Sequence, residues 1–235
     1  MPVVTELPPT ADETPPANPY PGDTLPAALG RHGIALPADQ IERLDQYCRL
    51  LWEWNEKINL TRHTDYEKFV ARDLVDSLQL AKHLNAGEEV LDVGTGGGVP
   101  GLLLAIVRPD LRVSLCDSVG KKIKVVDEIS RALGLETTTF PFRAEEVLED
   151  TRYDALVLRA VGPLWKLLTW FRPHWPSLRR LLIIKGPKWE EELPEAKRRG
   201  LLRELDLKVA ARYDMPGTGS QSVILKIWPK GTPER

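Results

Sequence analysis

Apolar residues recur with two different periods along this chain. Between residues 37 and 55 they return every three or four positions, the spacing of a helix with one buried face. This stripe consists of Ile41, Leu44, Cys48 and Leu51, with Asn55 at the same spacing. A second stripe of helical spacing, over residues 65–84, contains Phe69, Val70, Leu74, Leu78, Leu80 and Ala81. We therefore predict two amphipathic helices ahead of residue 86.

From residue 89 onward the pattern changes to short β-rich runs separated by segments of helical length. The runs are Val90–Val93, Arg112–Cys116, Thr137–Phe140, Ala155–Leu158, Leu181–Lys185 and Ser222–Trp228. Such alternation predicts an α/β fold with a mostly parallel sheet and helices on both faces. Near the end, Leu207–Tyr213 and the last run flank a Pro- and Gly-rich turn, which predicts a C-terminal antiparallel hairpin.

The first residues have a different composition from the rest of the chain. Residues 1–26 are rich in proline and poor in apolar side chains, which favours a disordered tail. We therefore divide the chain into this tail, an N-terminal helical appendage over 27–86, and an α/β domain over 87–235.

Composition narrows the class of protein. The chain has 235 residues, enough for one full core, and its hydrophobic fraction of 42% is that of an ordinary globular protein. A net charge of -2 argues against non-specific coating of DNA, although a local basic face could still bind RNA. No apolar run reaches the length of a membrane span, and no secretion signal is visible. Cys48 and Cys116 lie far apart and match no metal spacing, so we expect no metal site. We expect both thiols to lie in the core of a cytoplasmic protein.

A glycine loop follows the first predicted strand of the sheet and is the strongest chemical signal. The strand contains Asp92 and runs directly into Gly94-Thr-Gly-Gly-Gly98. No lysine follows, so a P-loop is disfavoured, and Gly94, Gly96 and Gly98 do not have the spacing of a dinucleotide site. An Asp-x-Gly-x-Gly pattern after the first strand is instead the signature of methyltransferases that hold S-adenosylmethionine, which we take as the expected cofactor.

Two further positions are predicted to hold this cofactor. Asp117 follows the second strand, where a carboxylate can accept hydrogen bonds from ribose hydroxyls. Ala144 and Glu145 follow the third strand, and we expect their backbone to lie beside the adenine. The ends of the fourth and fifth strands add Arg159 and Lys185, our candidates for positioning a substrate.

Several motifs, in this order, resemble one family. They are Trp54-Asn-x-x-x-Asn-Leu-Thr61, Asp76-Ser77, Asp92-Val-Gly-Thr-Gly-Gly-Gly-Val-Pro-Gly101, Arg108-Pro109, Asp117-Ser-Val-Gly-Lys-Lys122, Arg143-Ala-Glu-Glu146, Arg159-Ala160 and Lys185-Gly186. Together they resemble the bacterial small-subunit ribosomal RNA guanine-N7 methyltransferase G family, also called glucose-inhibited division protein B, from about residue 27 to 230.

The resemblance implies a fold, a reaction and a set of contacts. The fold would be the Rossmann-like class I methyltransferase fold, with a seven-stranded sheet and an N-terminal helical appendage. The reaction would be methyl transfer to N7 of a guanine in 16S ribosomal RNA or the small subunit, which needs no catalytic base because N7 carries a free lone pair. Cofactor contacts carried over from the family are Gly94, Val99, Ala144, Glu145 and Arg159. From the general logic of the fold we also expect Asp92, Gly96, Gly98 and Asp117 to bind the cofactor.

Departures from the family pattern leave alternatives open. Asp73 stands where the family usually has histidine, and the C-terminal segment lacks the usual aromatic-Pro-Arg close. A non-catalytic ribosome- or RNA-binding protein that retains the fold, or a methyltransferase with another substrate, would also fit. An NAD(P)-dependent oxidoreductase is disfavoured by the loop spacing. We expect the protein to act as a monomer.

Overall fold

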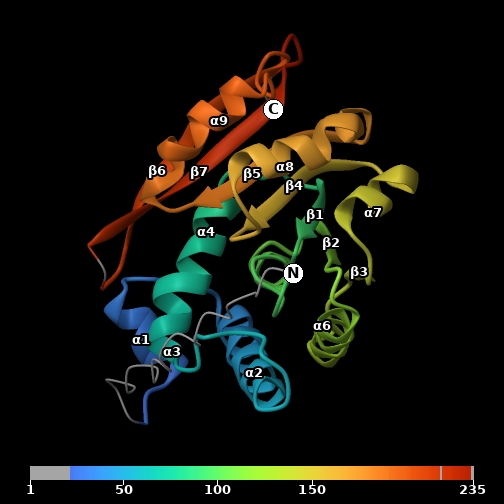
Figure 1. The fold of residues 1–235 in the computed structure, drawn as a ribbon. Helices are drawn as coiled ribbons and strands as arrows, with labels where there is room; N and C mark the ends of the chain where they lie inside the picture. The colour runs from blue at the N-terminus through green and yellow to red at the C-terminus, as the bar shows by residue number, and fades with distance from the viewer. Residues whose placement is uncertain (1–21, 218, 234–235) are drawn as a thin grey trace, which may run out of the picture.

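A seven-stranded sheet forms the centre of the molecule (Figure 1), which we describe from a computed structural model that places residues 22–217 and 219–233. The strands are β1 (Glu89–Val93), β2 (Arg112–Cys116), β3 (Thr138–Phe140), β4 (Tyr153–Arg159), β5 (Leu178–Lys185), β6 (Leu205–Met215) and β7 (Ser220–Pro229). Their order across the sheet is β3-β2-β1-β4-β5-β7-β6. The first five are parallel, whereas β7 runs antiparallel to β5 and forms a hairpin with β6. The predicted sheet and terminal hairpin are confirmed.

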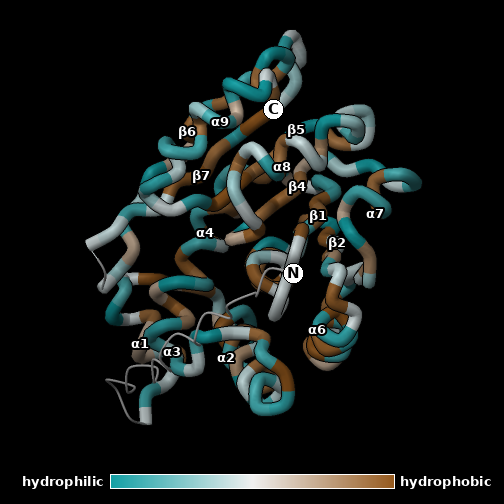
Figure 2. Tube along the Cα trace, in the orientation of Figure 1, coloured by the Kyte–Doolittle hydropathy of each residue, from teal (hydrophilic) through white to brown (hydrophobic). Residues whose placement is uncertain are grey.

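Helices cover both faces of this sheet. Helices α2 (Ala38–Asn55), α4 (Val75–Ala81), α5 (Gly101–Val107) and α6 (Gly120–Ala132) bury their apolar sides in one cluster. Helices α7 (Ala144–Asp150), α8 (Leu164–Phe171) and α9 (Leu193–Arg198) pack in the other. Within β4, Val157 joins the first cluster and its neighbours Leu156 and Leu158 join the second, as the two-residue period of a strand requires. The hydropathy colouring shows that the central strands are largely apolar, because both faces of the sheet are covered there (Figure 2).

The N-terminal helices continue the core of the sheet. Besides α2 and α4 they comprise α1 (Leu25–Arg31), α3 (Tyr66–Lys68) and a π-helical turn, η1 (Phe69–Leu74). The residues of α2 that face inward are Leu44, Tyr47, Cys48 and Leu51, close to the predicted stripe. They share one cluster with Leu102 of α5 and Val126 of α6. Both cysteines are buried, as expected.

One boundary needs correction. Leu25 is fully buried and begins α1 after an N-cap at Thr24, so helical structure starts inside the segment assigned to the tail. Residues 1–21 of that tail lie outside the described residues. Among the helices that the structure places, none is long and apolar enough to cross a bilayer.

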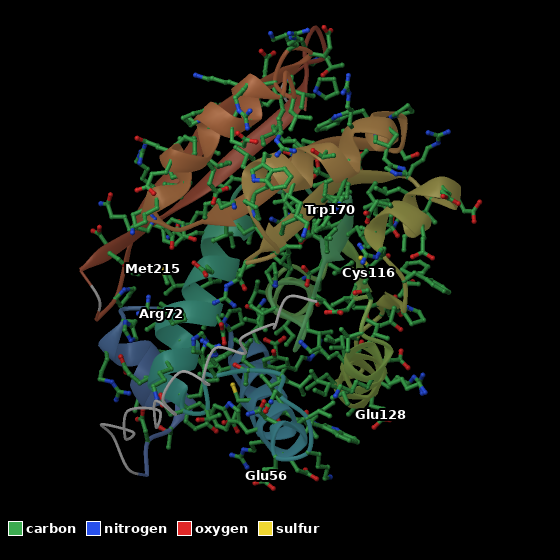
Figure 3. The ribbon with its side chains drawn as sticks, viewed as in Figure 1. Glu56, Arg72, Cys116, Glu128, Trp170 and Met215 are labelled. Carbon is green, nitrogen blue, oxygen red and sulfur yellow. The ribbon has the colours of Figure 1, made fainter. Side chains whose placement is uncertain are left out.

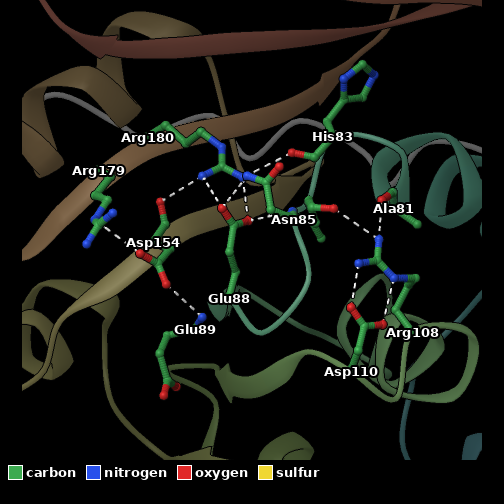
Figure 4. Close-up of polar contacts among 11 residues, drawn as sticks. Ala81, His83, Asn85, Glu88, Glu89, Arg108, Asp110, Asp154, Arg179 and Arg180 are labelled. Carbon is green, nitrogen blue, oxygen red and sulfur yellow. Dashed lines mark hydrogen bonds and ion pairs between the residues drawn. The ribbon is translucent and has the colours of Figure 1, made fainter. Parts of the chain in front are cut away.

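A network of charged side chains around the buried Arg180 closes the amino edge of the sheet (Figure 4). The Arg180 guanidinium of β5 is bound to the Glu88 carboxylate at 3.0 Å and to the His83 carbonyl at 3.0 Å. Arg108 bridges the Asp110 carboxylate and the carbonyls of Ala81 and Leu84. These contacts fix the connection between α4 and β1, and through it the helices ahead of the sheet.

Candidate active site

The glycine loop joins β1 to α5, and the side chain of Asp92 in β1 holds it through hydrogen bonds. This carboxylate is fully buried, and its Oδ2 atom accepts hydrogen bonds from the Thr95 hydroxyl at 2.6 Å and the Gly101 amide at 2.8 Å. Burial raises the pKa of Asp92 to about 7, although the hydrogen bonds from Thr95 and Gly101 act in the opposite direction. Asp92 thus joins both ends of the loop, and its side chain presents no surface to a ligand.

The loop needs glycine for two different reasons. Gly94, Gly96 and Gly98 all have positive φ, at +69°, +58° and +98°. A Cβ atom at Gly98 would lie 2.6 Å from Leu102, so glycine there is a requirement of packing. At Gly96 the same atom would meet only the Gly94 carbonyl, 4.0 Å away, so its outer side is open to a ligand.

Asp117 connects the end of β2 to the same loop. Its Oδ2 atom accepts from the Gly96 amide at 3.1 Å, and its Oδ1 atom accepts from the Val119 amide at 2.8 Å. A carboxylate held in this way keeps lone pairs available for hydroxyl donors. The structure therefore brings Asp117 and the glycine loop together, as the sequence predicted.

A cavity of about 100 Å³ begins at Asp117, and we call it the nucleoside cavity. Ala144 and Glu145 at the start of α7 line it, beside Phe142 and Trp170. Trp170 of α8 and Cys116 of β2, both labelled in Figure 3, reach it from different elements. Phe142 is 50% exposed, unusual for a large apolar side chain, and could stack on a planar ligand. Phe142 and Trp170 were missed in the sequence because isolated aromatics carry no motif.

A second cavity, of about 370 Å³, lies on the other side of the glycine loop, and we call it the substrate cavity. Gly94 lines both cavities. The remaining lining comes from two groups: Thr95, Gly96, Gly97, Val99, Arg159 and Ala160 of the α/β domain, and Leu51, Leu60, Thr61, Arg62, His63 and Asp73 of the N-terminal helices and their connecting loop. The helical appendage is therefore one wall of the site.

Arg159 is the centre of a polar cluster in the substrate cavity. Its guanidinium lies 2.7 Å from the Asp73 carboxylate and 2.8 Å from that of Asp76. The Asp76 carboxylate also accepts from the Tyr213 hydroxyl of β6 at 2.7 Å, and Asp73 lies 2.9 Å from the His63 ring. Two carboxylates from neighbouring helical turns thus hold the guanidinium, and His63 and Tyr213 in turn hold the carboxylates.

The charges of this cluster follow from its burial. Burial alone would lower the pKa of Arg159, but Asp73 and Asp76 outweigh it and raise that pKa, so the guanidinium stays charged. Burial raises the pKa of Asp76, and Arg159 and Tyr213 only partly offset this. Two carboxylates against one guanidinium give the cluster a net negative charge while both are ionised.

The remaining sequence candidates lie in different places. Val99 lines the substrate cavity, whereas Gly98 lines neither cavity. Lys185 also lines neither: its ammonium binds the Glu192 carboxylate at 2.8 Å and the Gly162 carbonyl at 2.6 Å. Lys185 therefore ties the end of β5 to its neighbouring loops, and direct contact with a substrate has no support in the geometry. The roles of His63 and Tyr213 were missed because only the tertiary structure brings them to Arg159.

The strand order, the glycine loop and the carboxylate after β2 define a class I S-adenosylmethionine-dependent methyltransferase. Solved structures agree in fold. The chain matches M. capricolum TrmK in complex with S-adenosyl-homocysteine with a TM-score of 0.53 at 12% identity, over 68% of this chain and 70% of that one. It also matches the precorrin-6y C5,15-methyltransferase of Geobacter metallireducens with a TM-score of 0.50 at 12% identity, over 74% of this chain and 95% of that one.

Sequence comparison identifies the family. The profile of the GidB family, rRNA small subunit methyltransferase G, matches residues 40–213. The ribosomal RNA small subunit methyltransferase G of Rhodopirellula baltica is 50% identical over 188 residues, which cover 80% of this chain and 81% of that protein. Its counterpart in Christiangramia forsetii is 43% identical over 176 residues, covering 71% and 82%. The chain belongs to the rRNA small subunit methyltransferase G family and is an S-adenosylmethionine-dependent methyltransferase.

Proposed function

We propose that this protein transfers a methyl group from S-adenosylmethionine to N7 of a guanine in 16S ribosomal RNA. The observation that carries the proposal is the pair of cavities that meet at Gly94, one lined by the cofactor-type residues and the other lined by the polar cluster around Arg159. The family relatives, by name, act on small-subunit ribosomal RNA. A substrate cavity of about 370 Å³ falls within the size range of small-molecule sites and suits one flipped-out base.

The residues present fit the proposed cofactor. Gly96 leaves open space where a side chain would otherwise stand, and Asp117 offers carboxylate lone pairs beside it. Asp117, Ala144 and Glu145 would hold the nucleoside part, with Phe142 against the adenine, and Gly94, Gly96 and Val99 the methionine part. Asp92 and Gly98 act indirectly, by fixing the loop. When bound, the cofactor supplies an electrophilic methyl group.

The substrate cavity supplies orientation and charge. Guanine N7 is a free acceptor at neutral pH, so no residue has to remove a proton from it. The ring becomes positively charged on methylation, and the net negative cluster of Asp73, Asp76 and Arg159 favours that charge. Holding the base against Arg159 lowers the barrier further, because the reacting atoms are already aligned.

The test is methylation of small ribosomal subunits that lack this modification, with radiolabelled S-adenosylmethionine. Borohydride and aniline treatment, which cleaves RNA at N7-methylguanosine, would then map the position. We expect label in 16S RNA and one cleavage site. Label without cleavage would indicate another atom or base, and cofactor binding without any label on RNA would favour another substrate. Subunit binding with neither cofactor binding nor label would favour the non-catalytic alternative.

We further propose that the protein acts as a monomer in the cytoplasm, where ribosomal RNA is made. The glycine loop lies between the two cavities, so one chain supplies both the cofactor side and the substrate side of the site. Light scattering of the purified protein at micromolar concentration would test the monomer, and a stable dimer would contradict it.

A further inference from the structure

The motif from Asn55 to Thr61 builds a rigid loop at the end of α2. Asn55 is the last residue of the helix, and its side-chain oxygen accepts from the backbone amides of Leu60 at 2.8 Å and Thr61 at 2.9 Å. The Thr61 hydroxyl accepts from the His63 amide at 3.0 Å, and the Trp52 indole donates to the His63 carbonyl at 2.8 Å. We call residues 60–63 the 60–63 loop. Its backbone groups have side chains as hydrogen-bond partners in place of the backbone partners that a helix or strand would provide.

The 60–63 loop faces the glycine loop across the substrate cavity. Thr61, Arg62 and His63 line that cavity. A Cβ atom at Gly97 would lie 3.3 Å from the Leu60 carbonyl, so the two loops pack closely. His63 is also bound to Asp73. The position of the loop relative to the Arg159 cluster is therefore fixed before any substrate arrives.

Arg62 differs from the other arginine of the cavity. Arg159 is bound by two carboxylates and lies inside. Arg62 is exposed, and no carboxylate lies within ion-pair distance of it in the described part of the chain. A base bound in the cavity remains covalently joined to the RNA backbone, so its phosphates must lie at the entrance of the cavity. An arginine at the entrance can donate two parallel hydrogen bonds to one phosphate.

We propose that Arg62 binds a backbone phosphate next to the target nucleotide, and that Asn55 is the positioning residue that holds Arg62 there. This inference rests on the proposed RNA substrate. It gives the N-terminal helices a role in recognising RNA, separate from the nucleoside cavity on the other side of the glycine loop.

Binding of unmethylated small subunits, measured without cofactor over a range of salt concentrations, tests Arg62. We expect R62A to raise the Kd about tenfold and to reduce the slope of log Kd against log salt by about one, because one phosphate contact is lost. R62K should restore most of the slope. The matched control is R172A. Arg172 is exposed in η2 (Arg172–Ser177), which precedes β5 at the amino edge of the sheet, opposite the carboxyl edge where the cavities lie. Among the placed residues, no carboxylate lies within ion-pair distance of it. Wild-type binding by R62A, or an equal loss in R172A, would overturn the proposal.

A double-mutant cycle tests the positioning role of Asn55. N55A should weaken subunit binding, and N55A/R62A should bind no more weakly than R62A within about twofold, because the two residues act as one unit. Independent, additive losses would refute the positioning role. Circular dichroism and thermal unfolding report whether N55A is folded. R62A carries the test of the phosphate contact in any case, since its side chain is exposed.

The two proposals can fail separately. If the wild-type protein methylates guanine N7 but R62A binds subunits normally, this inference fails and the proposed function stands. If R62A loses subunit affinity but the wild type labels no RNA, the surface binds RNA and the proposed reaction fails.

Discussion

Asp92 offers a substitution that separates charge from hydrogen bonding. In D92N an amide oxygen can replace Oδ2 and still accept from Thr95 and Gly101, while the buried negative charge is removed. The second oxygen, Oδ1, has no hydrogen-bond partner in the described structure. In D92N the amide nitrogen would occupy this position without an acceptor, which would lower the free energy of unfolding by about 1–3 kcal/mol.

The magnitude follows from the pKa of this group. Burial raises it to about 7 from the ordinary value of 3.8. An acid whose pKa is raised on folding destabilises the folded state increasingly as pH rises from the unfolded value to the folded one, and the loss then levels off. In the wild type this loss grows by about 2.5 kcal/mol between about pH 5 and about pH 8.5, and D92N lacks it.

Thermal unfolding of the cofactor-free proteins at these two pH values is the assay. We expect the Tm of D92N relative to the wild type to rise by roughly 5–10 °C on going from the lower to the higher pH. D92A is the control, because it removes the charge and the acceptor together and should be destabilised at both pH values. A Tm difference between D92N and the wild type that does not change with pH would refute the raised pKa.

Three further predictions test other parts of the site. G98A should lower the Tm by roughly 5–10 °C, because φ is +98° and the added Cβ would lie 2.6 Å from a neighbouring leucine, whereas G120A, where nothing lies within 4 Å, should leave it nearly unchanged. D117A should raise the Kd for S-adenosylmethionine at least about tenfold by calorimetry, through loss of a charged acceptor, and an unchanged Kd would exclude the ribose role. Y213F should lower kcat a few-fold and raise the pKa of Asp76 further, because a hydrogen bond that stabilises its ionised form is lost. An unaltered kcat would show that the hydrogen bond from Tyr213 to Asp76 does not contribute to the reaction.

The sequence was sufficient for the sheet and for half of the site, because these depend on local chemistry. Strands buried on both faces are continuously apolar, and the loop after β1 needs glycine at positive φ, so both leave local patterns. The carboxylate of Asp117 follows at the end of the next parallel strand, and adjacent parallel strands end at one edge. These features place Asp117, Ala144 and Glu145 around one cavity beside the glycine loop, and their contacts with the cofactor stay a prediction.

Only the tertiary structure decided what Asp92 and Lys185 do and what forms the substrate side. Asp92 reads as a ligand in sequence, but burial beneath the loop makes it a support. The Arg159 cluster joins residues from η1, α4 and β6, and its Asp76–Tyr213 hydrogen bond spans 137 positions. No local pattern encodes such contacts, because each partner alone is an ordinary polar residue and only the packing of the helices against the sheet gives it a partner.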